Sequence, residues 1–297
     1  MPDFTDAFSL SKTADIAFCV NGKTILADNE NGEKPVIPIN DERITAENFK
    51  TFLLYLYSDK AEVTGDNAFT LMNLGKMYDV PSLISFVGEF LISNLTSENV
   101  VTIANSASIF NDTTVLKNSV DFIMKNSNVL KSEQQFFQLN EQVLSMVLNK
   151  DKGNLFCHSS SVENGLCHIC GNAPTFSEID LFKMLLKWGE NQCITKGIQP
   201  IPQNLKTVLK EFLPLIRFPT MTINELVNVV YPTKLFDSYV MWNMTIDAQN
   251  LIDGQPTNKS GFSHVKRQAC STPAQSQQFQ RVQRLQLSCR GGWTLRS

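Results

Sequence analysis

Cysteine and histidine side chains gather in one short part of this sequence, where they could bind a metal ion. Cys157 and His158 precede Cys167, His168 and Cys170. The Cys-x-x-Cys spacing lets two thiolates hold one Zn²⁺, and Cys157 with either histidine would complete a tetrahedron. The overall spacing matches no common zinc finger. Two interpretations stay open, a zinc site and a loop insertion without a ligand, and we favour the second.

Other catalytic chemistry has few candidate residues. The three histidines are His158, His168 and His264, two in an irregular stretch and one in a basic tail, so a histidine-dependent triad would have to be assembled from irregular segments. Neither the P-loop nor the dinucleotide-binding glycine motif occurs. We therefore expect that the protein is not an enzyme and has no cofactor.

The composition is that of a folded chain of about two domains, with 297 residues, 42% hydrophobic and 19% charged. No stretch approaches the roughly 18 apolar residues of a membrane helix, and the acidic N-terminus is unlike a signal peptide. Seven cysteines at irregular spacings suit a reducing compartment. We expect a cytoplasmic protein without membrane contact.

The C-terminal end has a different character from the rest. Residues 259–297 hold seven basic residues and no acidic one, although the whole chain has a net charge of −3. From Gln255 onward no period is visible, which predicts poor order. Charge alone gives salt-sensitive, nonspecific attraction, so we expect no specific nucleic-acid partner.

Hydrophobic periodicity predicts a small sheet followed by helices. Residues 14–20 alternate, Asn21-Gly22 is typical of a hairpin turn, and residues 35–39 contain Pro38, which restricts them to an edge strand. From Thr45 the period becomes helical, and we expect a core stripe and further helices. The stripe comprises Phe49, Phe52, Tyr55 and Leu56, and the further helices cover residues 67–78, 81–93, 100–110, 115–125, 141–148 and 179–192.

Local signals add detail to this helical region. Ser177 with Asp180, and Thr222 with Glu225, have the spacing of capping boxes, and we expect Trp188 in the core. Residues 152–176 have no period, and no internal repeat of fixed length is visible.

Five stretches, in the same order, resemble a BTB/POZ domain followed by a BACK domain in the BTB-BACK-PHR family. They are Asp15–Lys23 (opening hairpin), Phe49–Asp59 (a helix ending in Tyr-Leu-Tyr), Lys76–Leu83 with Phe90–Val100 (last BTB helices and the junction), Leu181–Trp188 and Leu215–Thr222 (late BACK helices). The resemblance implies a mainly α protein: a truncated α+β BTB domain, then an all-helical BACK domain.

The resemblance also implies domain bounds. They are an N-terminal extension at 1–12, the BTB/POZ domain at 13–95, the BACK domain at 96–251 with an irregular insertion at 152–176, and a basic tail at 252–297 that resembles the entry of a PHR domain. Near 28–35 a short polar segment replaces the centre of the BTB domain. In the family this centre carries most of the dimer surface and a cullin contact, so its replacement puts homodimerisation and direct cullin binding in question.

The function that the resemblance implies is a protein-interaction adaptor that recruits substrates to a cullin-RING ubiquitin ligase. The alternative is a BTB-type oligomeric scaffold or transcriptional regulator without ligase activity. We expect partner contact near the BTB-BACK junction, at polar residues that face away from the apolar stripe of their helix. These are Ser97, Glu98, Asn99 and Ser106.

Overall fold

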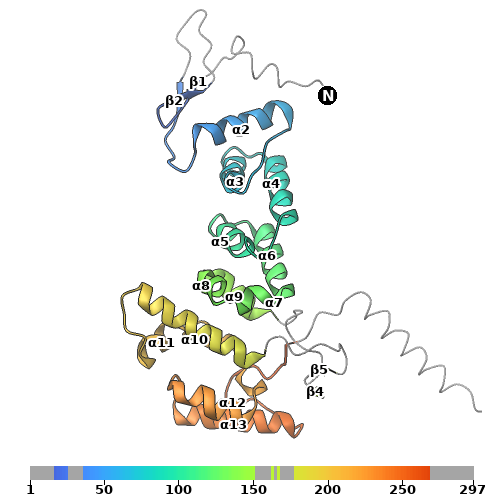
Figure 1. Cartoon of the computed structure of the whole chain (residues 1–297), viewed down its shortest axis with the longest axis vertical. Helices are drawn as coiled ribbons and strands as arrows, with labels where there is room; N and C mark the ends of the chain where they lie inside the picture. The colour runs from blue at the N-terminus through green and yellow to red at the C-terminus, as the bar shows by residue number, and fades with distance from the viewer. Residues whose placement is uncertain (1–16, 26–35, 151–161, 164–165, 168–176, 268–297) are drawn as a thin grey trace, which may run out of the picture. The chain divides into compact units, whose positions relative to one another are not determined.

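The computed structural model of the chain describes residues 17–25, 36–150, 162–163, 166–167 and 177–267 (Figure 1). The predicted fold class is confirmed: the described chain is mainly helical and has a small α+β region at its N-terminal end. The chain forms two compact units, and the boundary between them lies between residues 119 and 120. The domain bounds given above stay predictions.

The sheet of the first unit has three strands in the order β2-β1-β3. β1 (Ala17–Val20) pairs antiparallel with β2 (Lys23–Ile25) and parallel with β3 (Val36–Ile39). Asn21 and Gly22 turn the hairpin with φ angles of 47° and 83°, the left-handed values that such a turn requires. β3 lies at the edge, as its proline predicted.

Five helices follow the sheet, and the last of them, α6, continues past residue 119, where the first unit ends. They are α2 (Ala46–Ser58), α3 (Ala68–Met77), α4 (Pro81–Ser93), α5 (Val100–Ile109) and α6 (Thr113–Lys125). Thr45 caps α2 by accepting a hydrogen bond from the backbone N–H of Asn48. Phe49 and Phe52 are buried and contact Tyr78. The prediction that Leu56 joins this core is wrong: the residue is 48% exposed, because in the last turn of α2 the neighbouring Tyr55 is the residue that faces the core, where it contacts Phe86.

The helix pairs α3–α4 and α5–α6 form a repeat that the sequence analysis did not find. Thr64 and Asn67 precede the first pair, and Thr96 and Asn99 precede the second, 32 residues later (96 − 64). In both, the threonine N–H donates to the asparagine Oδ1 at 2.8 Å, and the asparagine N–H donates to the threonine Oγ1 at 3.3 Å. The asparagine Nδ2 also donates to the carbonyl two residues before the threonine, at 2.9 and 2.8 Å.

The two pairs also match in their lengths and connections. α3 and α5 have 10 residues each, and α4 and α6 have 13 each. Asp79 and Asn111, between the helices of each pair, both have a φ of 53°. The repeat therefore rests on shared conformations and caps, and few of its equivalent positions carry the same residue.

The second unit is built around one long helix, α10 (Glu178–Thr195). The predicted capping box is confirmed, because the Ser177 and Asp180 side chains each bind the other residue's backbone N–H. Trp188 is 1% exposed and donates its indole N–H to the carbonyl of Leu139 at 3.0 Å. The second unit also contains α7 (Ser127–Lys131), α8 (Glu133–Gln138), α9 (Glu141–Asn149), α11 (Pro202–Val208) and two short strands that pair with each other, β4 (Val162–Glu163) and β5 (Leu166–Cys167).

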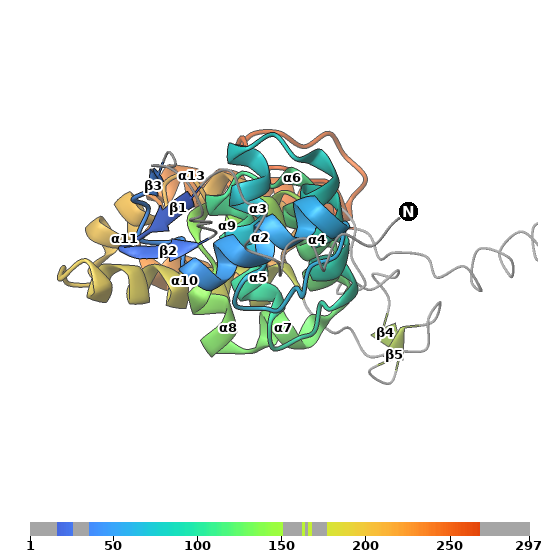
Figure 2. The same ribbon diagram turned by 90° about the horizontal axis from the view of Figure 1, so that it is seen from above.

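Short helical turns connect α11 to the last helix, α13 (Ser238–Ile252). They are η2 (Leu213–Leu215), η3 (Phe218–Thr220), α12 (Ile223–Glu225), the π-helical η4 (Leu226–Val230) and η5 (Tyr231–Thr233). Thr222 and Glu225 form the second predicted capping box. Figure 2 shows the chain from above, with α11 and α13 labelled.

Residues 254–267, which we call the C-terminal strap, are anchored to the second unit. The buried carboxylate of Asp247 accepts hydrogen bonds from the backbone N–H groups of Asn258, Lys259 and Ser260 at 2.7 to 3.0 Å. Arg267 is 7% exposed. The prediction of poor order from Gln255 onward is therefore wrong for the strap, because single polar anchors replace the apolar period that the prediction relied on. The rest of the tail, 268–297, lies outside the described residues.

Candidate partner-binding surfaces

The predicted contact residues lie around the start of α5. Glu98 is exposed, whereas Ser97, Asn99 and Ser106 are half-buried. Asn99 and Ser106 are seven residues apart, about two helical turns, and so share one face of the helix. The Asn99 side chain accepts a hydrogen bond from the backbone N–H of Thr96 and donates one to the carbonyl of Asn94, so its first role is to fix the loop before α5.

Glu98 carries the charge of this surface. The pKa of its carboxyl is below the ordinary value, mainly because the Thr96 side chain forms a hydrogen bond with it and also because its own backbone N–H does. The carboxylate is therefore anionic at neutral pH and is held beside the cap. This arrangement offers a partner one fixed negative charge. The role of these four residues in partner contact stays a prediction.

The predicted metal ligands cannot be placed. Cys157, His158, His168 and Cys170 lie outside the described residues, and Cys167 is described only as part of the backbone of β5. Within the parts of the chain that the structure describes, no three His, Cys, Asp or Glu residues come together to hold a metal ion. Zinc binding at the Cys/His cluster stays a prediction.

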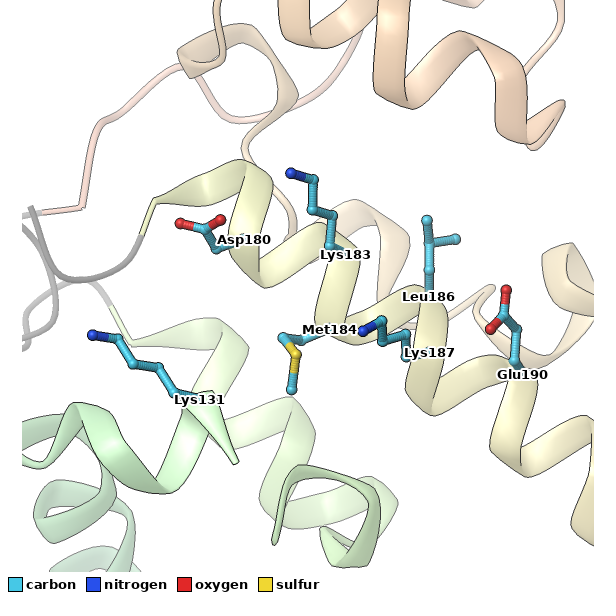
Figure 3. A pocket seen from close by; sticks show the side chains of 7 residues that line it. All are labelled: Lys131, Asp180, Lys183, Met184, Leu186, Lys187 and Glu190. Atoms are coloured by element: carbon cyan, nitrogen blue, oxygen red, sulfur yellow. The ribbon is translucent and has the colours of Figure 1, made fainter. Parts of the chain in front are cut away.

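A second surface, which was not predicted from the sequence, runs along α10. A groove of about 570 Å³ is lined by residues of α7 and α10 (Figure 3). They are Lys131, Asp180, Lys183, Met184, Leu186, Lys187 and Glu190. The sequence does show Lys183 and Lys187 four residues apart, a spacing that places both on one helix face. The same spacing is common on solvent-exposed helices, so it does not by itself predict a groove.

The described part of the chain contains no helix that is both long and apolar enough to cross a membrane.

Comparisons with known proteins find one matching family. Residues 22–95 match the BTB/POZ domain family. BTB/POZ domain-containing protein 6 of Mus musculus and of Homo sapiens are each 23% identical over 180 residues, which is 61% of this chain and 30% of theirs. BTB/POZ domain-containing protein 3 of Homo sapiens is 22% identical over the same shares. The alignments thus span less than a third of the length of these relatives.

Proposed function

This chain contains a BTB/POZ domain at residues 22–95, and from this premise we propose that it is a protein-interaction adaptor without enzymatic activity. The family match is the observation that carries the proposal. The relatives named above are themselves described as BTB/POZ domain-containing proteins. The proposed location is the cytoplasm, in keeping with seven irregularly spaced cysteines that suit a reducing compartment.

The finer proposal is that the adaptor delivers substrates to a cullin-RING ubiquitin ligase. Residues 96–251 would form the BACK arm, and the start of α5 would contact the partner. Three features support this surface: Glu98 is exposed and anionic, the Thr96–Asn99 cap fixes its backbone, and Ser106 lies on the same helix face as Asn99.

A pull-down with the N-terminal region of the type-three cullin tests this proposal. The wild-type chain is expected to capture the cullin, and Glu98→Arg is expected to lose it because the charge is reversed at the contact. Glu89→Arg is the matched control, since Glu89 is also exposed and lies on α4 of the same unit. Capture by Glu98→Arg at the wild-type level would disprove the role of Glu98, and no capture by the wild type would disprove ligase recruitment.

The alternative is a BTB-type oligomeric scaffold or transcriptional regulator without ligase activity. The observation that favours it is the exposed edge of the sheet, where Val36 is 57% and Ile37 is 40% exposed. Among the described residues β3 has one neighbour, β1, and an apolar strand with a free edge can pair with a second copy. Analytical ultracentrifugation would detect a homodimer that Ile37→Lys dissociates. A monomeric wild-type chain would contradict this alternative.

A further inference from the structure

The groove along α10 has the chemistry of a peptide-binding surface. We propose that it binds an acidic peptide segment of a partner protein, with the carboxylates of the peptide on Lys131 and Lys183 and an apolar side chain over Met184. This surface lies in the second unit, so the proposal goes beyond the adaptor function and does not depend on the BTB/POZ domain.

Two lysines of the groove have no anionic partner in the described structure. Lys131, at the end of α7, and Lys183, on α10, are both exposed, and neither forms an ion pair or a hydrogen bond there. Their ammonium groups are available to carboxylates that arrive from outside. Because they come from two different helices, an extended peptide can contact both along the groove (Figure 3).

Most of the acidic side chains around the groove already form hydrogen bonds or ion pairs within the protein. The Asp180 carboxylate accepts hydrogen bonds from the backbone N–H and the hydroxyl of Ser177, at 2.9 and 2.6 Å. Glu133 forms an ion pair with Lys187. Glu190 lies at the opposite end of the groove from Lys131 (Figure 3). The carboxylate of Asp180 also lies at the Lys131 end (Figure 3), but the ammonium groups of Lys131 and Lys183 outnumber it, so this end of the groove carries an excess of positive charge that an acidic segment complements.

The groove also has an apolar part. Met184 lies between the two ends of the groove (Figure 3) and is 9% exposed, and Leu186 is half-buried. A methionine side chain is flexible and polarisable, so it can adapt to the apolar residue of a bound peptide. Charge therefore attracts the acidic segment, and the apolar contact adds selectivity for a hydrophobic residue between its acids.

Fluorescence anisotropy tests the proposal with the full chain and a labelled synthetic peptide that has glutamates around one leucine. The wild type is expected to bind it. The double variant Lys131→Glu with Lys183→Glu is expected to bind about tenfold more weakly, because two attractive pairs become repulsive. Binding should also weaken as salt is raised.

The matched control is Lys206→Glu with Lys210→Glu, which changes the net charge equally at two exposed lysines near α11, outside the groove. This control is expected to bind the peptide as the wild type does. A peptide with glutamine at every glutamate, or with asparagine in place of leucine, should bind more weakly. Absence of wild-type binding, equal losses in both double variants, or full binding of the glutamine peptide would each overturn the proposal.

Discussion

A single carboxylate, Asp247, organises the strap. It is fully buried and accepts hydrogen bonds from three consecutive backbone N–H groups and from the Ser260 hydroxyl. Burial by itself would raise the pKa of Asp247, but these hydrogen bonds, led by that of the Ser260 hydroxyl, together bring the pKa below its ordinary value. The charged form therefore stabilises the folded state.

Asp247→Asn is expected to lower the free energy of unfolding at pH 7 by about 2 kcal/mol, because hydrogen bonds to a charged group are lost. Since the folded pKa lies below the unfolded one, the wild-type advantage is complete above the unfolded value, roughly 4, and disappears as the pH falls through the folded value. Urea unfolding of both proteins from pH 7 to pH 3 measures this.

Asp253→Asn is the control for that experiment. Asp253 is exposed at the end of α13, and its carboxylate accepts hydrogen bonds from the side chain of Gln249 in the same helix. Its substitution is expected to change stability by less than about 0.5 kcal/mol. If Asp247→Asn were as stable as Asp253→Asn at pH 7, the carboxylate would not anchor the strap.

Among the elements, the sequence predicted most helices and missed how they repeat. Ser177 and Thr222 gave recognisable capping signals, and each caps a helix as predicted. The repeat was not predicted because its equivalent positions share a conformation and a cap, whereas most of them carry different side chains. For example, Asp79 and Asn111 have the same left-handed φ with different side chains. Thr64 and Thr96 are identical, as are Asn67 and Asn99, but such matches are too few for a search for identical residues to reveal the repeat.

The repeated caps predict equal effects from equivalent substitutions. Asn67→Ala and Asn99→Ala should each lower the free energy of unfolding by about 1 kcal/mol, because each removes the same side-chain hydrogen bonds before a helix. Asn118→Ala is the control, since Asn118 is exposed within α6 and contacts only a carbonyl of its own helix. Chemical unfolding compares the three, and a loss confined to one of the two caps would contradict the equivalence.

Two helical glycines predict opposite outcomes. A Cβ at Gly189 of α10 would lie 2.8 Å from Leu209 Cδ2, whereas a Cβ at Gly88 of α4 would meet nothing nearer than 3.8 Å. Gly189→Ala should therefore destabilise the protein by about 1 kcal/mol, because Leu209 is fully buried and must move. Gly88→Ala should stabilise it by up to about 1 kcal/mol through helix propensity. Thermal unfolding that ranks the two variants the other way would contradict the close packing of α10 on Leu209.

At the scale of the whole molecule, sequence reasoning found what is periodic or local. It predicted the hairpin, the capped helices and the BTB/POZ resemblance, which the family match supports. It could not find the strap or the α10 groove, because both depend on residues that are distant in sequence. Lys131 and Lys183, for example, line one groove from two helices, α7 and α10, although residues 132–177 separate these helices in the sequence.

Arg267 is the clearest case of such a long-range contact. Its guanidinium forms an ion pair with Glu178 at 2.9 Å. It also donates to the carbonyls of Leu148, Lys150 and Leu215 at 2.6 to 2.9 Å. One buried side chain thus connects the end of α9, the start of α10 and η2 to the strap. Its removal would take the cationic partner from the buried carboxylate of Glu178, which would keep the hydrogen bond from the backbone N–H of Arg217, and would leave the three carbonyls without this donor.

Arg267→Met is expected to lower the free energy of unfolding by about 3 kcal/mol, because the buried charge of Glu178 loses its partner. Lys266→Met is the control, since Lys266 is exposed one residue earlier and its loss should cost little. Combining Arg267→Met with Glu178→Gln should cost less than the sum of the two single changes, because the second substitution removes the unpaired charge. Strictly additive effects in denaturant unfolding would show that the pair does not hold the strap against α10.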